Sequence, residues 1–138
     1  MSTAMSTIAP LVAPLVQGDY DAPFWKAWAD NEQFLLHRCS ICGRYDWPSG
    51  CCVEHGMAPM QWVETAAAGV VDTYTIFHRA YIKEMAAEVP YTVAVVRLDE
   101  GPYFHTRLVD IAPDAVTTGM RVRVRRGAGD AFPLFVPV

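Results

Sequence analysis

The four cysteines of this 138-residue chain all lie between Cys39 and Cys52, and they constrain the fold more than any other feature. Residues 36–60 around them are interrupted by prolines and glycines and show no apolar periodicity that could build a core. So short a segment folds only when something besides hydrophobic burial holds it together. Because metal ligation contributes on the order of 10 kcal/mol to small modules, the cluster predicts a metal-stabilised module.

The spacing of the cysteines suggests which side chains bind the metal. Cys39 and Cys42 are separated by two residues, as in a zinc knuckle, and Cys52 and His55 repeat that spacing. We therefore prefer Cys52 to Cys51, which would then point away. Three sulfurs and one nitrogen would complete a closed tetrahedral site for a structural Zn²⁺, with no position left for substrate. The predicted ligands are Cys39, Cys42, Cys52 and His55.

Three alternatives for the cluster stay open at this point. The cysteines could be buried side chains without a metal, Cys51 could replace Cys52 as a ligand, or Cys39 and Cys42 could form a redox pair. The redox alternative is the weakest because no thioredoxin-like strand–helix–strand pattern surrounds them.

A helix is predicted from about residue 22 to residue 34, ahead of the cysteines. Asp21 suits the N-cap position and Pro23 suits the first turn. Phe24, Trp25 and Trp28 fall near helical spacing. Such an aromatic stripe is typical of a core-facing helix, but two tryptophans on so short a helix also suggest a partner interface.

After Trp62 the residue pattern becomes typical of β-strands. Short runs rich in β-branched and aromatic residues occur at 69–78, 91–98, 103–108, 121–125 and 132–136, with turn signals between them. Five such strands predict a small barrel or sandwich. Residues 79–88 fit either a short helix or a mobile loop.

The charge and hydropathy of the chain argue against some classes of protein and some cellular locations. The formal net charge of −4 argues against a sequence-independent DNA-binding protein, and no apolar run is long enough for a membrane span. Residues 1–20 are interrupted by prolines and resemble no signal peptide. We expect a mobile N-terminal arm there, or alternatively a partner-docking arm, and a cytoplasmic protein.

A basic cluster stands out against this acidic background. Strand alternation places the first three of its arginines on one face, with valines between them facing inward. The cluster is either a solvated strand face or a binding site for an anion, such as coenzyme A phosphates or an acidic partner surface. Its members are Arg121, Arg123, Arg125 and Arg126.

The order of short motifs along the chain resembles the DUF35 family. The matching residues are Pro23-Phe24-Trp25, Leu36, Cys39-x-x-Cys42-Gly43, Pro48, Cys52-x-x-His55, Trp62, Gly69, Pro90, the run at 93–101, Gly119-Met120-x-Val122 and Pro133-Leu134-Phe135. The resemblance covers residues 22–138. It implies a mainly β protein with an N-terminal helix at 21–35, a rubredoxin-like zinc ribbon at 36–61 and a five-stranded OB-fold barrel at 62–138.

The resemblance also implies a function. Members of the family accompany thiolase-like proteins that act on acyl-CoA thioesters, in thiolysis, retro-aldol cleavage of steroid side-chain CoA thioesters, or acyl transfer. We therefore expect a non-catalytic, auxiliary subunit that supports a thiolase-like partner and helps to frame the acyl-CoA site, in a heterotetramer or larger assembly.

The alternative function is a module that binds single-stranded nucleic acid. OB-folds can stack bases on aromatic side chains in a basic groove, and Tyr74, Phe77, Tyr103 and Phe104 could provide such a platform. Residues 69–138 carry equal numbers of basic and acidic side chains, which makes this alternative less favourable.

Overall fold

The structure is a computed structural model that describes residues 21–48 and 50–138, so the arm predicted at 1–20 lies outside the described residues. It opens with helix α2 (Ala22–Asn31), which has proline in its first turn as predicted. The helix ends earlier than expected because Glu32 adopts the left-handed conformation (φ 54°). The Asp21 carboxylate caps no backbone N–H and instead accepts a hydrogen bond from Trp25 Nε1 at 3.1 Å.

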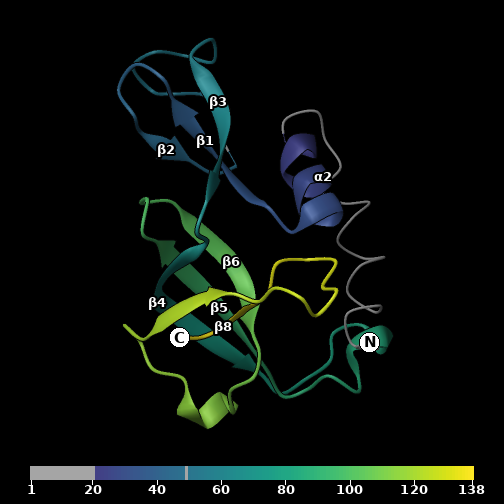
Figure 1. The fold of residues 1–138 in the computed structure, drawn as a ribbon. Helices are drawn as coiled ribbons and strands as arrows, with labels where there is room; N and C mark the ends of the chain where they lie inside the picture. The colour runs from purple at the N-terminus through teal and green to yellow at the C-terminus, as the bar shows by residue number, and fades with distance from the viewer. Residues whose placement is uncertain (1–20, 49) are drawn as a thin grey trace.

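A small antiparallel sheet follows the helix (Figure 1). Its strands are β1 (Phe34–Cys39), β2 (Tyr45–Asp46) and β3 (Met60–Thr65), in the order β2-β1-β3. We call this sheet with its connecting loops the ribbon. The full-length pairing of β1 with β3, from Phe34–Thr65 to Cys39–Met60, extends the ribbon beyond the expected 36–61 on both sides.

The second half of the chain forms a closed barrel. Its strands are β4 (Ala68–Phe77), β5 (Tyr91–Leu98), β6 (Tyr103–Leu108), β7 (Arg121–Val124) and β8 (Phe135–Pro137), in the order β4-β5-β6-β8-β7. Only the β6–β8 pair is parallel; the remaining barrel pairs are antiparallel. This five-stranded barrel is the expected OB-fold.

The barrel strands match their predicted ranges closely, except β8, which starts at Phe135 rather than near residue 132. Residue 69 must be glycine, because a Cβ at this position would lie 2.2 Å from the backbone oxygen of Arg97 on the paired strand. The segment at 79–88 is a loop with one 3-10 turn, η1 (Lys83–Met85), and a second turn, η2 (Pro113–Ala115), precedes β7.

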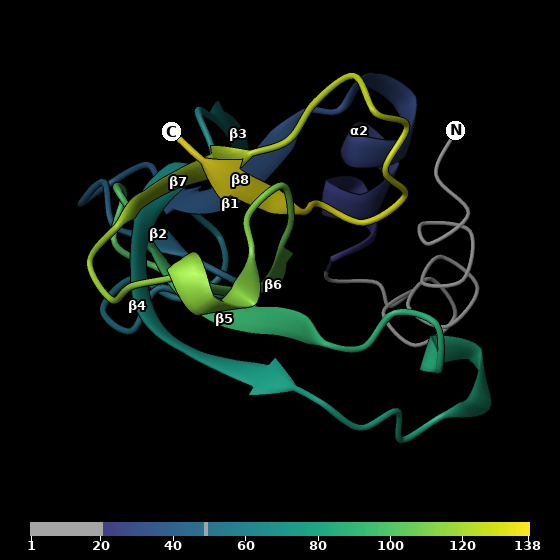
Figure 2. The same cartoon turned by 90° about the horizontal axis from the view of Figure 1, so that it is seen from below.

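One hydrophobic core joins the ribbon, the helix and the barrel. The ring of Phe34, at the start of β1, lies 5.1 Å from Phe24 of the helix and 5.0 Å from Phe104 of β6, centroid to centroid. Trp28 donates from Nε1 to the backbone oxygen of Asp130 at 2.7 Å, which fastens the segment before β8 alongside α2 (Figures 1 and 2). The ribbon is therefore packed on the barrel rather than tethered to it.

Among the described residues, no helix is both long and apolar enough to cross a lipid bilayer.

Candidate metal centre

Two tight turns carry the predicted ligands. Cys39 ends β1, and the chain reverses so that the Gly43 N–H donates to the Cys39 carbonyl at 2.8 Å. The positive φ of Gly43 (78°) suits glycine at this reversal. The second turn closes through two backbone hydrogen bonds between Cys52 and Gly56, of 2.9 and 2.8 Å. Each turn is the four-residue knuckle that the spacing predicts.

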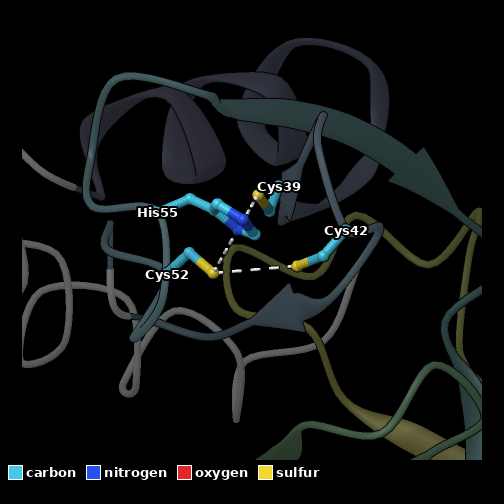
Figure 3. Close-up of side chains that lie close together, drawn as sticks. All are labelled: Cys39, Cys42, Cys52 and His55. Atoms are coloured by element: carbon cyan, nitrogen blue, oxygen red, sulfur yellow. Dashed lines mark hydrogen bonds between the residues drawn. The ribbon is translucent and has the colours of Figure 1, made fainter.

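The two knuckles face each other and bring four donor atoms together (Figure 3). The Cys39 and Cys52 sulfurs lie 3.5 and 3.6 Å from His55 Nδ1, and the Cys42 and Cys52 sulfurs are 3.8 Å apart. All four ligand atoms lie within 4.8 Å of one another.

These separations fit tetrahedral coordination. Metal–sulfur bonds of about 2.3 Å and metal–nitrogen bonds of about 2.0 Å set two sulfurs about 3.8 Å apart and a sulfur and a nitrogen about 3.5 Å apart. The Cys42–Cys52 distance is also far longer than the ~2.05 Å of a disulfide. The four residues are therefore positioned to bind a metal ion.

Cys51 is not part of this group. Its side chain is exposed, and its sulfur lies 3.5 Å from the Cys52 carbonyl oxygen. The structure thus brings together the preferred ligand set, with Cys52 rather than Cys51.

Backbone amides in the knuckles favour the thiolate form at two positions. N–H groups, chiefly that of Cys42, lower the pKa of the Cys39 thiol, and those led by Glu54 lower the pKa of Cys52. At Cys42 the Arg44 N–H acts in the same direction, but desolvation and the sulfurs of Cys39 and Cys52 outweigh it and raise the pKa. Thiolates are the form that binds metal, so at Cys39 and Cys52 the turns favour the protonation state that a metal site needs.

The helix aromatics do not form the surface that the interface prediction requires. Phe24 and Trp28 are 0% and 1% exposed within the chain itself, packed in the shared core. These two side chains have no area to offer a partner, which corrects that part of the prediction. Trp25 is half-buried, with its ring stacked on Phe132 at 5.5 Å.

Carboxylates pair with two of the four arginines of the basic cluster. Arg121 makes a bidentate pair with Asp99 (2.7 and 3.0 Å), and Arg125 makes one with the buried Asp130 (2.7 and 2.9 Å). Sequence reasoning missed both partners, which lie 22 and 5 residues away and carry no local signature.

The other two arginines bond backbone oxygens. Arg126 Nε donates to the Glu32 carbonyl oxygen at 3.1 Å, which ties the barrel to the helix end. Arg123 is exposed, and its guanidinium contacts the Val124 carbonyl oxygen at 3.5 Å.

The aromatic platform for nucleic acid is not assembled either. Phe104 is 2% exposed in the core, and Phe77 is stacked on Tyr91 with ring centroids 5.1 Å apart. Tyr103 is the large aromatic of that set that stands exposed, at 50%. The alternative of a base-stacking surface gains no support from this geometry.

Comparison with known proteins gives the family. Residues 62–126 match the family described as the C-terminal OB-fold domain of ChsH2. A DUF35 domain-containing scaffold protein from Methanocaldococcus jannaschii is 31% identical over 100 residues, which span 71% of this chain and 70% of that protein. This chain belongs to the DUF35 family.

A second relative of this DUF35 chain is a probable enoyl-CoA hydratase alpha subunit from Thermomonospora curvata. It is 38% identical over 103 residues, which span 74% of this chain but 32% of that protein. The chain thus matches about a third of the length of that relative.

Two solved structures resemble this DUF35 chain. A chain from an Ltp2-ChsH2(DUF35) aldolase has a TM-score of 0.75 and 32% sequence identity, covering 88% of this chain and 97% of that chain. A DUF35-family protein of unknown function from Sulfolobus solfataricus has a TM-score of 0.64 at 17% identity, covering 96% and 94%. The second likeness shows the fold alone.

Proposed function

We propose that this chain is an auxiliary, non-catalytic subunit of a heteromeric enzyme that acts on acyl-CoA thioesters, with a thiolase-like protein as its catalytic partner. The observation that carries the proposal is the match to almost the whole of the DUF35 chain in the Ltp2-ChsH2(DUF35) aldolase, at 32% identity. The scaffold and hydratase-subunit names of the two relatives are in keeping with it.

The metal in this subunit is Zn²⁺. Three sulfurs and an imidazole nitrogen are donors that zinc prefers, and they would fill its tetrahedral shell completely. A filled shell leaves no position for water or substrate, so the ion would stabilise the fold and take no part in turnover. Cys39, Cys42, Cys52 and His55 would hold it, joining the two knuckles of the ribbon.

The shared core gives the scaffold its rigidity. β1 carries Cys39 of the metal centre at one end and Phe34 of the barrel core at the other. A partner that contacts the ribbon and the barrel together would therefore meet a surface of fixed shape. Such a surface can hold a catalytic subunit in its active conformation and complete the entrance to its acyl-CoA site.

Two smaller points belong to the same proposal. Trp25 and the outer barrel surface are the candidates for the partner contact. Arg123 and Arg126, which make no ion pair with a carboxylate among the described residues, are the arginines of the basic cluster that could meet a coenzyme A phosphate. We place the assembly in the cytoplasm as a heterotetramer or a larger hetero-oligomer.

Co-expression with the thiolase-like or aldolase protein of the source cell tests the proposal. The two chains should co-elute in size-exclusion chromatography, and cleavage of an acyl-CoA thioester should require the partner and increase when this subunit is added. Failure of every such protein to bind, or turnover by this chain alone, would contradict the proposal.

A further inference from the structure

A groove of about 470 Å³ lies beside the connection from β4 to β5. That connection supplies one wall and projects past the ends of β4 and β5 in Figure 2. Residues of β5 and β6 supply a second wall, and the segment at 132–134 ahead of β8 supplies a third. The groove is separate from the metal centre, because none of the four predicted ligands lines it.

Aromatic rings form much of the lining of this groove. Phe77 and Tyr91 are stacked with their ring centroids 5.1 Å apart, and the Tyr81 ring lies 6.1 Å from that of Phe77. Tyr81 and Ile82 are 74% and 43% exposed. These four side chains do not belong to the core that joins the ribbon to the barrel. Core packing therefore does not account for them, and exposed apolar surface of this kind marks a binding site.

The polar side chains of the lining are largely committed to partners within the chain. The Arg107 guanidinium donates to the Glu88 carboxylate at 2.8 Å and lies 4.9 Å over the Tyr91 ring. The Thr106 hydroxyl donates to the backbone oxygen of Pro133 at 2.8 Å, and His105 is exposed to solvent. An occupant that complements this groove is therefore apolar and uncharged.

The chain itself carries a segment of that character. Residues 9–16 read Ala-Pro-Leu-Val twice in succession, and no side chain ahead of Asp19 is charged. Proline fixes its own φ and disfavours the helical conformation at the residue before it, so the repeat favours an extended chain. Extended segments that contain proline bind grooves lined by aromatic rings, because little conformational entropy is lost on docking.

The described part of the chain begins next to the groove. Asp21 accepts a hydrogen bond from Trp25 Nε1 at 3.1 Å, and the Trp25 ring is stacked at 5.5 Å on Phe132, which lines the groove. The chain from Val16 to Asp21 can span about 16 Å when extended. The repeat at 9–16 is therefore tethered within reach of the groove.

We propose that this groove is a peptide-binding site and that its occupant is the Ala-Pro-Leu-Val repeat at residues 9–16 of the same chain. The leucine and valine side chains of the repeat pack against the rings of Phe77, Tyr81 and Tyr91. A short tether gives a segment an effective concentration of about 1 mM at its own site, so a modest intrinsic affinity suffices. The inference stands on the groove and the repeat, and it does not depend on the function proposed above.

The first experiment looks for the contact directly in the full zinc-loaded chain by NMR. The methyl groups of Leu11 and Leu15 should show nuclear Overhauser effects to the rings of Phe77 and Tyr91. Ile82→Asp places a charge in the apolar groove and should abolish these effects. The matched control is Val138→Asp, at a side chain that is 76% exposed and outside the groove, and it should retain them.

The second experiment uses a fluorescent synthetic peptide with the sequence of residues 7–18 and follows its binding by anisotropy. The full-length variant Leu11→Asp/Leu15→Asp has an empty groove, so it should bind the peptide about tenfold more tightly than wild type does. That ratio corresponds to a Kd of about 0.1 mM against a tethered competitor at about 1 mM. Ser2→Asp/Thr3→Asp adds the same charge outside the repeat and should bind the peptide as weakly as wild type.

Four results would overturn the proposal. Two of them are wild-type protein without the contacts, or with contacts that survive Ile82→Asp, and equal affinity of wild type and the repeat variant for the peptide. Contacts seen only between differently labelled copies in a mixed sample would make a second copy the occupant. Groove resonances that respond to a thiolase-like protein but not to the peptide would make that protein the occupant. Equal thermal unfolding temperatures of Ile82→Asp and Val138→Asp keep lost contacts from being read as unfolding.

Discussion

Each metal ligand lies in a backbone turn that is closed by main-chain hydrogen bonds. The hydrogen bonds between Cys52 and Gly56, and between Gly43 and Cys39, set the two knuckles, and amides directed at sulfur favour thiolates at Cys39 and Cys52. Residue chemistry and backbone geometry therefore point to the same four ligands.

A matched pair of cysteine substitutions tests this assignment. Cys52→Ser should abolish zinc binding and destabilise the protein by more than about 4 kcal/mol, because loss of a metal ligand is among the most damaging single changes. Cys51→Ser, one residue away and exposed, should retain one zinc per chain and wild-type stability. Elemental analysis with thermal unfolding measures both, and zinc loss in the Cys51 variant would refute the assignment.

The Asp99–Arg121 ion pair contributes to the free energy of unfolding, and the direction in which this contribution changes with pH follows from the pKa of Asp99. The hydrogen bonds from Arg121 hold the pKa of Asp99 below its ordinary value of 3.8. A carboxyl with a lowered folded-state pKa contributes stability above its unfolded pKa, and this is lost as pH falls through the folded value. Since both side chains are half-exposed, the contribution is below about 1 kcal/mol.

Urea titrations of wild type and Asp99→Asn at several pH values measure that contribution. The difference in unfolding free energy should be present at pH 7 and shrink progressively as the pH falls below the ordinary carboxyl pKa of 3.8. Acid release of zinc affects both proteins, so the comparison isolates the pair. A difference that grows on acidification would have the wrong sign.

Among the elements, β1 and α2 supply the side chains that pack the ribbon against the barrel. β1 reaches from the barrel core to the metal centre, and α2 covers the core with Phe24 and Trp28. The aromatic stripe of the helix is therefore an internal packing surface, fixed further by the bond from Trp28 Nε1 to Asp130.

Replacing Trp28 with alanine should consequently destabilise the whole subunit, by about 3–5 kcal/mol, as other large-to-small core changes do. Val53→Ala, at an 80% exposed knuckle position, should change stability by less than about 0.5 kcal/mol. Urea denaturation followed by circular dichroism measures both. A Trp28→Ala protein of normal stability would show that the helix is not part of the core.

The sequence predicted these elements unevenly, for physical reasons. Local signals sufficed for the knuckles, where two-residue spacing sets the geometry, and for β7, where Val122 and Val124 alternate with arginines. They failed at the end of α2, where Glu32 turns left-handed without a glycine. The ion partners Asp99 and Asp130 depend on contacts that only the folded chain creates.

At the scale of the whole molecule, the chain is a ribbon and a barrel joined by one core, with four Cys and His side chains positioned to bind a metal ion in the ribbon. No feature of that centre offers a coordination position to a substrate. In the function proposed above, the catalytic groups belong to another polypeptide, and this subunit contributes shape and contact.

The most direct test of this view is acyl-CoA cleavage assayed with this chain alone, with the thiolase-like partner alone, and with the purified complex of the two. The complex should turn over the thioester, the partner should be weak or inactive by itself, and this chain should show no activity at any concentration. Turnover by the isolated chain, or a partner whose rate is indifferent to it, would contradict the account.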